Sequence, residues 1–285
     1  MTQGNALDSS RLARHRCLGY GRAMQPDDQN GNGEDAWFGD RPVPAADKPG
    51  LVRGVFATVA GRYDLMNDLM SGGIHRLWKS AMIDALMLRP GQHVLDVAGG
   101  TGDIAQRIVE RWGGPERAIA AGGRVTVCDL TRDMVAIGRD RAIDRGWIAG
   151  IDWVVGDAEA LPFAEMSLDR YAIAFGLRNV TRPERALAEA HRVLKPGGRL
   201  VCLEFSRVAL PWLSRLYDLY SFQVLPALGA AVAGDADAYR YLAESIRRFP
   251  PQDELAAMMA AAGLERVGYR NLSGGIAALH SAWRL

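Results

Sequence analysis

The order of apolar and polar positions predicts a sheet whose strands alternate with helices. Apolar stretches rich in β-branched residues occupy positions 93–98, 124–129, 151–158 and 168–175. The segments that join them suit the crossover helices that parallel strands need. A helix at 184–194 and a turn at 195–198 then lead to a strand at 199–206. This pattern predicts a doubly wound, mostly parallel α/β sheet.

Further elements are expected on both sides of these units. Before the first strand, helical spacing at 55–71 and 74–86 predicts cap helices, which either cover the sheet or form a lid over a ligand. After the last unit come helices at 238–246 and 252–262 and two strands at 264–269 and 275–283. We expect these strands to form an antiparallel edge pair, which brings the sheet to seven strands.

The first fifty residues lack this periodicity. They are rich in glycine, aspartate, asparagine, arginine and proline. We therefore predict a disordered N-terminal extension at 1–50 and a single folded domain at 51–285. A targeting peptide is the alternative for the extension, and several acidic residues between Asp27 and Asp47 oppose it.

Composition narrows the function classes. The chain has 285 residues, of which 48% are hydrophobic and 24% charged, enough to bury a sizeable core. A net charge of +1 gives no electrostatic case for nucleic acid as a partner. The three cysteines and five histidines show no ligand spacing, so we expect no metal site. No apolar run is long enough to span a bilayer, and we expect a cytoplasmic protein with reduced cysteines.

A glycine-rich turn follows the strand at 93–98. It reads Gly99-Gly100-Thr101-Gly102, and a helical pattern begins directly after it. Such a loop lets a ligand approach the backbone, and the helix start offers free N–H groups. The loop formally fits the dinucleotide fingerprint. However, the next strand-end acid, Asp129, lies about thirty residues further on, whereas that fold expects roughly twenty.

Acids at the ends of successive strands favour a second cofactor class. Asp129 and Asp157 each end an apolar stretch. This arrangement resembles the class I methyltransferases, which use S-adenosylmethionine. The resemblance implies that Gly99 and Thr101 hold the methionyl end, Asp129 the ribose, and Asp157 with Ala158 the adenine. The two acids could instead be helix N-caps. Asp96, inside an apolar strand, either supports the loop or touches the cofactor.

A more specific resemblance covers 51–285. The chain resembles the ubiquinone/menaquinone biosynthesis C-methyltransferase family in several motifs, of which FGLRNV and YRYLAESI are the most particular. These motifs are YDLMND at 63–68, GIHRLWK at 73–79, AGGTGD at 98–103, FGLRNV at 175–180, RVLKPGG at 192–198, and DAD at 235–237 with YRYLAESI at 239–246. Two positions depart from the family pattern. Ala174 stands where serine is common, and Gly234 where asparagine is usual.

This resemblance implies transfer of a methyl group to a ring carbon of a polyprenylated benzoquinol or naphthoquinol. A ring carbon becomes nucleophilic once an adjacent phenol loses its proton, so the site must stabilise negative oxygen. Arg178, a charged multi-donor fork, is the candidate for that role, and Asn179 could orient the ring or a water. Alternatively, Arg178 pairs with a local acid and only fixes the loop. Tyr63 and Asn67 are candidate substrate-binding residues.

The remaining expectations concern the general base, the apolar segment at 211–233, the partners and the alternative functions. His75 is a weak candidate for a general base, and a water ordered by Arg178 and Asn179 stays open. The apolar segment at 211–233 is either a core helix, or a wall for the prenyl tail or a membrane-resting surface. We expect peripheral contact with the inner face of the membrane and an assembly of quinone-synthesis enzymes as partners. Methylation of another phenolic or lipid-like acceptor, or a catalytically idle cofactor-binding subunit, are the other functions kept open.

Overall fold

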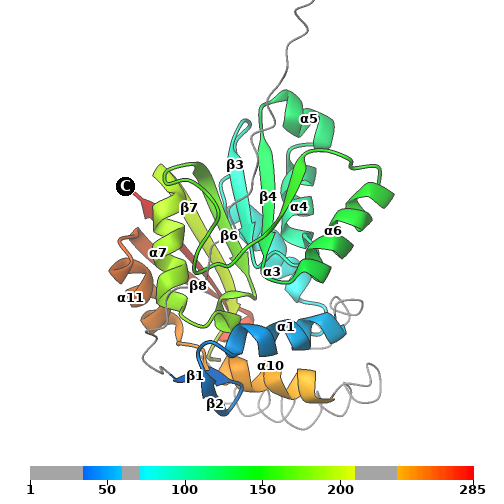
Figure 1. The fold of residues 1–285 in the computed structure, drawn as a ribbon. Coiled ribbons are helices and arrows are strands. Elements are labelled where there is room, and N and C mark those ends of the chain that lie inside the picture. The colour runs from blue at the N-terminus through cyan, green and yellow to red at the C-terminus, as the bar shows by residue number, and fades with distance from the viewer. Residues whose placement is uncertain (1–34, 60–67, 69–70, 209–235) are drawn as a thin grey trace, which may run out of the picture. The chain divides into compact units, whose positions relative to one another are not determined.

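A seven-stranded sheet forms the centre of the protein. The computed structural model describes residues 35–59, 68, 71–208 and 236–285. The strand order is β5-β4-β3-β6-β7-β9-β8, and only β9 runs antiparallel to its two neighbours (Figure 1). The strands are β3 (His93–Val97), β4 (Arg124–Asp129), β5 (Ile151–Val155), β6 (Leu168–Ala174), β7 (Leu194–Phe205), β8 (Glu265–Leu272) and β9 (Ala277–Arg284). The predicted doubly wound, mostly parallel sheet is confirmed.

Helices cover both faces of this sheet. One apolar core packs α3 and α4 against it through Met82 and Ile108, and the other packs α7 and α11 through Leu187 and Met259. Burial on both faces explains why the parallel strands read as continuous apolar runs. The helices are α3 (His75–Ala85), α4 (Asp103–Arg111), α5 (Pro115–Ala120), α6 (Arg132–Asp144), α7 (Pro183–Val193), α10 (Ala236–Arg248) and α11 (Gln252–Ala261). None of the described helices is long and apolar enough to cross a membrane.

The two closing strands are antiparallel, as expected, but only one lies at the edge. β9 is inserted between β7 and β8. Its alanines 277, 278 and 282 are fully buried, whereas most side chains of β8 are exposed. The small buried side chains suit β9 for an interior position, and the polar sequence of β8 suits it for the edge.

The N-terminal boundary at residue 50 is wrong for the residues just before it. A hairpin of β1 (Asp35–Phe38) and β2 (Arg41–Pro44) precedes α1 (Lys48–Val59). Ala36 and Phe38 are buried, in alternation with exposed neighbours. Strands of four residues are too short to stand out from a polar surrounding, which is why the pattern did not reveal them. Residues 1–34 lie outside the described part, so their predicted disorder stays a prediction.

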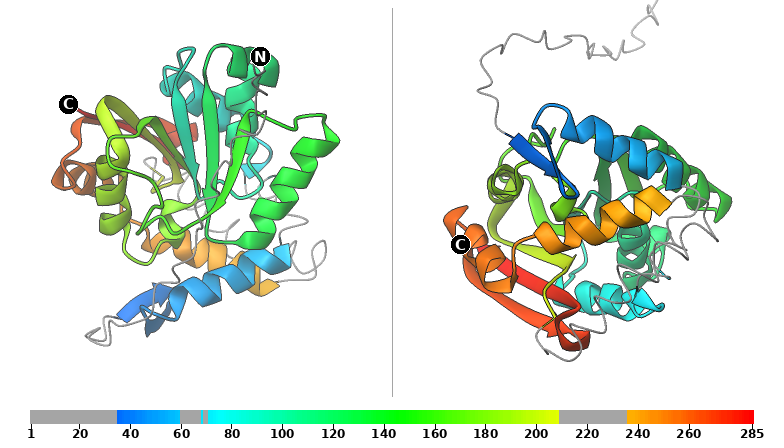
Figure 2. Two further views of the ribbon diagram at one scale, coloured as in Figure 1. Left: turned by 45° about the horizontal axis from the view of Figure 1, so that its top comes forward. Right: turned by 90° about the horizontal axis from the view of Figure 1, so that it is seen from below.

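The hairpin and α1 lie with α10 across one end of the sheet (Figures 1 and 2). Phe38, Val52 and Tyr241 form a small apolar cluster that joins β1, α1 and α10. The Lys48 ammonium donates a hydrogen bond to the carbonyl of Val180, at 2.9 Å. The predicted helix at 74–86 is confirmed as α3. Most of the remaining cap at 60–70, and the whole segment at 211–233, lie outside the described residues.

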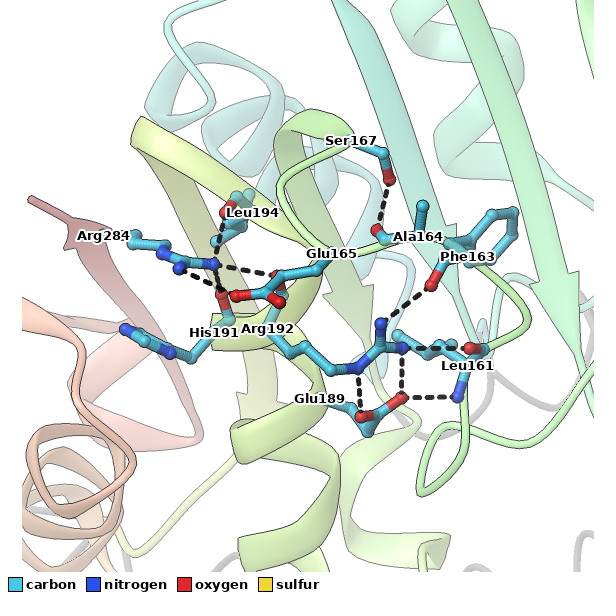
Figure 3. A network of polar contacts seen from close by, with 10 residues as sticks. All are labelled: Leu161, Phe163, Ala164, Glu165, Ser167, Glu189, His191, Arg192, Leu194 and Arg284. Atoms are coloured by element: carbon cyan, nitrogen blue, oxygen red, sulfur yellow. Dashed lines mark hydrogen bonds and ion pairs between the residues drawn. The ribbon is translucent and has the colours of Figure 1, made fainter.

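A polar network fixes the loop that follows β5 (Figure 3). The Arg192 guanidinium donates to the carbonyls of Leu161 and Phe163, at 3.0 and 2.8 Å, and also binds Glu189. The Glu189 carboxylate accepts the N–H of Leu161, at 2.7 Å. Arg284 from β9 donates to carbonyls at the end of α7, which would otherwise lack helical partners.

Candidate active site

A cleft opens at the carboxyl ends of β3, β4, β5 and β6, next to α1. It encloses about 1080 Å³, part of it open to solvent. Its walls come from 98–101, 129–131, 156–159 and 174–176, together with Pro49, Val52 and Phe56 of α1. Ligands of doubly wound sheets bind at this edge. The cleft therefore brings together the three strand ends that the sequence singled out, after β3, β4 and β5. Phe56 belongs to the segment at 55–71, for which a lid over a ligand is one of the two expectations.

The glycine loop is closely packed against its surroundings. Gly102 has a φ of +77°, and a Cβ there would lie 2.5 Å from the Trp153 ring. A Cβ on Gly99 would lie 2.8 Å from the Asp96 carboxylate. Only glycine suits these positions, because any side chain would displace β5 or the floor of the cleft. The loop thus carries Thr101, also predicted, to the cleft wall without a side chain in the way.

Asp129 lies beside this loop at the end of β4. One carboxylate oxygen, Oδ2, accepts the N–H of Gly100 at 2.9 Å, and the other accepts the N–H of Thr131 at 2.8 Å. Burial raises the pKa of this carboxyl, and the two backbone hydrogen bonds oppose the rise. Asp129 is not a helix N-cap, since α6 begins at Arg132 with Thr131 as its N-cap. It closes a turn and also faces the cleft.

Asp157 and Ala158 occupy the cleft wall after β5. The Asp157 carboxylate accepts the N–H of Glu159 at 2.9 Å, so it stabilises a turn rather than a helix start. Ala158 is buried and lines the same wall. The network around Glu189 and Arg192 holds the continuation of this loop in place.

Asp96 is fully buried at the floor of the cleft. Its Oδ2 accepts the N–H of Ala105 in α4, at 3.2 Å, which is the loop-supporting role kept open from the sequence. Its Oδ1 is buried and has no hydrogen-bond partner among the described residues. Burial raises the pKa of Asp96 to about 8. A cleft carboxyl with a free oxygen can bind a donor group of a ligand.

An ion pair that the sequence analysis missed closes one side of the cleft. The Lys79 ammonium from α3 lies 2.8 Å from Oδ2 of Asp103, the first residue of α4. Arg107 binds the other oxygen of Asp103, at 2.9 Å. These cations hold the pKa of Asp103 low although burial raises it. Asp103 directly after the glycine loop was the available signal, but its partner comes from a separate helix.

Arg178 and Asn179 lie in the 3₁₀ turn η2 (Leu177–Asn179) after β6. The Arg178 guanidinium is 3.0 Å from the Glu204 carboxylate, and it also donates to the carbonyl of Phe175. Asn179 is half-buried and lines the cleft, as does Ala174, where the family's serine is missing. The pairing of Arg178 with an acid, left open from the sequence, is present, and its catalytic role stays a prediction.

Glu204 and Tyr241 complete this part of the site and were not predicted. Glu204 lies on β7, and its Oε1 accepts the N–H of Arg178 at 3.2 Å. The Tyr241 hydroxyl, from α10, donates to Oδ1 of Asn179 at 3.1 Å. An acid within the apolar strand at 199–206, and a tyrosine within a particular motif, were the signals that could have found them.

The other candidates lie apart from the cleft or outside the described residues. Tyr63 and Asn67 belong to the second group, so their substrate-binding role stays a prediction. His75 is buried beside Ser71, with Nδ1 and Oγ 2.9 Å apart, and burial lowers its pKa. In the described part of the chain, no three metal-ligating side chains gather into a candidate metal site.

Comparison with known proteins shows which family the chain belongs to. Residues 45–284 match the model of the ubiE/COQ5 methyltransferase family. The chain belongs to that family. It is 57% identical over 262 residues to a ubiquinone/menaquinone biosynthesis C-methyltransferase UbiE of Paracoccus denitrificans, which covers 92% of this chain and 100% of the relative. A UbiE of Brucella abortus is 54% identical and covers 87% of this chain and 90% of its own length.

Solved structures resemble the fold. A SAM-dependent methyltransferase from Aquifex aeolicus aligns with a TM-score of 0.50 and 17% identity, over 73% of this chain and 89% of its own. The methyltransferase bound to the Trm112 activator of Haloferax volcanii aligns with a TM-score of 0.55 and 17% identity, over 80% of this chain and 97% of its own. The ubiE/COQ5 family member described here is thus an S-adenosylmethionine-dependent methyltransferase.

The described residues fit that cofactor. The free Oδ1 of Asp96 at the cleft floor suits the ammonium of a methionyl group, whose positive charge favours the ionised carboxylate when it is bound. The crowded glycine loop leaves backbone rather than side chain facing the cleft. Asp129 faces the same space with a carboxylate that can accept further hydrogen bonds.

Proposed function

We propose that the protein moves a methyl group from S-adenosylmethionine to a ring carbon of a polyprenylated benzoquinol or naphthoquinol. The observation that supports this acceptor is the 57% identity to a ubiquinone/menaquinone biosynthesis C-methyltransferase over that relative's whole length. The family match, at residues 45–284, extends beyond the cofactor loop to the FGLRNV and YRYLAESI segments, and Tyr241 of the second donates a hydrogen bond to Asn179 of the first.

The cofactor's parts are assigned to the three strand ends. We propose that Gly99 and Thr101 face the methionyl end, that Asp129 binds the ribose hydroxyls, and that Asp157 and Ala158 border the adenine. All five residues line the same cleft, which supports the assignment. Asp129 is the strongest of these assignments, because a carboxylate accepts hydrogen bonds from two hydroxyls at once.

Apolar side chains in the lining of the cleft support the acceptor side of the proposal. When bound, the cofactor supplies an electrophilic methyl group on a positively charged sulfur. Val52 and Phe56 from α1 and Phe175 from the end of β6 face the cleft, which suits an aromatic ring and keeps water from it. Asn179 adds a polar group to the same lining, and we assign it to a ring oxygen of the acceptor. A prenylated acceptor implies that the enzyme works at the surface of a membrane.

The test combines quinone profiling with a direct assay. In a strain that lacks this gene, mass spectrometry should find a quinone precursor short by one methyl group, and expression of this chain should remove it. Purified enzyme should transfer a labelled methyl group to the demethylated benzoquinol, the demethylated naphthoquinol, or both. Unchanged quinones in the deletion strain, with no labelled product from either acceptor, would rule the proposal out. Labelling of another phenolic lipid instead would assign that lipid as the acceptor.

A further inference from the structure

Two neighbours of the Asn179 side chain favour one orientation of its amide. Its Oδ1 accepts a hydrogen bond from the Tyr241 hydroxyl at 3.1 Å, and its Nδ2 faces the carbonyl oxygen of Phe175 at 3.5 Å. In the opposite orientation the amide oxygen would lie against the Phe175 oxygen. Two carbonyl oxygens that face each other form no hydrogen bond, because neither carries a hydrogen. The surroundings therefore favour this orientation over the opposite one.

The Tyr241 hydroxyl is suited to act as a permanent donor. Its side chain is 4% exposed, and its ring stacks on Phe38 with centroids 4.3 Å apart. Burial raises the pKa of this phenol to about 12, with nearby Arg178 opposing the rise and Glu204 adding to it. The hydroxyl thus keeps its proton across the pH range in which the protein works, and it can always donate to Oδ1.

The other side of the amide is fixed as well. The Phe175 carbonyl accepts from the Arg178 guanidinium in addition to Asn179, and Glu204 holds that guanidinium. Phe175 itself has a φ of +56°, a backbone conformation that a bulky residue adopts only when its surroundings enforce it. The carbonyl that orients Nδ2 is therefore itself held rigidly in place.

One hydrogen of Asn179 remains for a ligand. An amide nitrogen carries two hydrogens, and the Phe175 carbonyl takes one of them. Within the part of the chain that the structure describes, the second has no protein partner, and Asn179 lines the cleft. Negative charge gathers on a ring oxygen of the acceptor when that phenol loses its proton, and a fixed donor there stabilises the anion from which the ring carbon then attacks.

We infer that Tyr241 is a positioning residue that turns Asn179 into a hydrogen-bond donor toward a ring oxygen of the acceptor. The inference rests on the proposed quinol acceptor. Phe38, on the N-terminal hairpin, serves the same purpose one step further away, because its ring holds that of Tyr241. The roles are separate, since Asn179 would touch the acceptor and Tyr241 would not.

The inference is tested with Tyr241→Phe, which removes the hydroxyl and keeps the ring stacking. Tyr269→Phe, which removes a hydroxyl elsewhere, is the control. Tyr269 also donates to a side chain, Asp253, at 2.7 Å, but on the exposed strand β8. We expect Tyr241→Phe to lower kcat about threefold to tenfold, the effect of one hydrogen bond, with unchanged affinity for S-adenosylmethionine. Asn179→Ala should lower kcat about 10²-fold. Tyr269→Phe should leave kcat at the wild-type value.

The double variant, with both Tyr241→Phe and Asn179→Ala, tests whether Tyr241 acts through Asn179 or only stabilises the fold. If Tyr241 acts only through Asn179, then adding Tyr241→Phe to Asn179→Ala lowers kcat no further. A full additional threefold to tenfold loss in that background, or wild-type kcat for Tyr241→Phe alone, would overturn the inference.

A readout without the acceptor separates this inference from the proposed function. In protein with ¹⁵N-labelled asparagine, the side-chain signal of Asn179 is the one that Asn179→Ala removes. Tyr241→Phe should shift this signal and speed its hydrogen exchange, whereas Tyr269→Phe should not. An Asn179 signal unmoved by Tyr241→Phe refutes the positioning role. A wild-type enzyme that methylates no quinol, with the signal shifted as expected, refutes the acceptor assignment alone.

Discussion

The guanidinium of Arg178 and the carboxylate of Glu204 form an ion pair 3.0 Å apart, with side chains only 2% and 1% exposed. The pair joins the turn after β6 to the neighbouring strand β7. Burial raises the pKa of Glu204, while Arg178 opposes the rise through its charge and two hydrogen bonds. Removing one partner would leave the other buried without compensation.

Arg178→Ala should therefore destabilise the fold. We expect the free energy of unfolding to fall by about 3–5 kcal/mol, as for other broken buried pairs. Cofactor binding should weaken with it, because the segment after β6 that lines the cleft loosens. Arg178→Lys should recover only part of the stability, since an ammonium lacks the planar fork. Denaturant unfolding and calorimetric titration measure both effects.

The matched control is Arg139→Ala. Arg139 pairs with Asp140, and both side chains are more than half exposed, at 57% and 62%. Its loss should cost less than about 1 kcal/mol. A stable, cofactor-binding Arg178→Ala protein whose kcat alone is about 10²–10³ lower would instead favour direct stabilisation of the acceptor's oxygen, as predicted from the sequence.

Asp129→Ala should weaken binding of S-adenosylmethionine about tenfold to a hundredfold, the loss of a pair of charge-assisted hydrogen bonds. The carboxylate also holds the N–H groups of Gly100 and Thr131, so the glycine loop should loosen too. Calorimetric titration measures the affinity. Asp133→Ala, an exposed acid four residues further on, is the control and should bind normally. Wild-type affinity in Asp129→Ala would remove Asp129 from the site.

Asp96 should make stability depend on pH. Its pKa is about 8 in the fold against an ordinary 3.8, so between these values the folded protein holds a proton that the unfolded chain has lost. The contribution is complete below pH 3.8, and it is lost as the pH rises toward 8. Asp129 and Glu204, whose pKa values are also raised, act in the same direction, and Asp103 acts against it.

The measurement is the free energy of unfolding of Asp96→Asn and wild type between pH 5 and 8. The fall with pH should be shallower in the variant, by up to about 1.4 kcal/mol per pH unit. The amide keeps an oxygen for the N–H of Ala105. Equal slopes in the two proteins would mean that Asp96 is ionised throughout this range.

Gly102→Ala should disturb the glycine loop. The new Cβ would lie 2.5 Å from the Trp153 ring, at a positive φ. We expect a loss of stability of about 1–3 kcal/mol, with weaker cofactor binding. Gly146→Ala is the control, because it has a similar φ of +78° and nothing within 4 Å of the new atom. If both variants lose equal stability, the backbone conformation rather than the Trp153 contact explains the cost.

Two truncations test the contributions of the N-terminal extension and of the hairpin at 35–44 separately. Deletion of 1–33 should leave stability and activity nearly unchanged, which follows from composition alone. Deletion of 1–50 should lower stability and activity, whereas the sequence alone predicted that both would stay nearly unchanged. It removes Phe38 from the ring of Tyr241 and Lys48 from the Val180 carbonyl. Melting temperature and cofactor affinity of both proteins provide the test, and a fully active 51–285 chain would contradict it.

The sequence by itself determined the sheet, the position of the cleft and the cofactor class. Strand and helix periods are local, and parallel strands bring their carboxyl ends to one edge. Acids such as Asp129 and Asp157 therefore had to gather beside the glycine loop. The short strands at 35–44 were the exception, because four residues carry too little periodicity.

Only the tertiary structure decided which side chains meet. Arg178 and Glu204 are 26 residues apart, Asn179 and Tyr241 are 62 apart, and the hairpin's Asp40 meets Glu244 across 204 residues. A hydrophobic pattern tells which face of a helix or strand is buried, but not which distant element covers it. Burial of a charge or an amide is tolerated only with a partner, and the packing of separate elements supplies that partner.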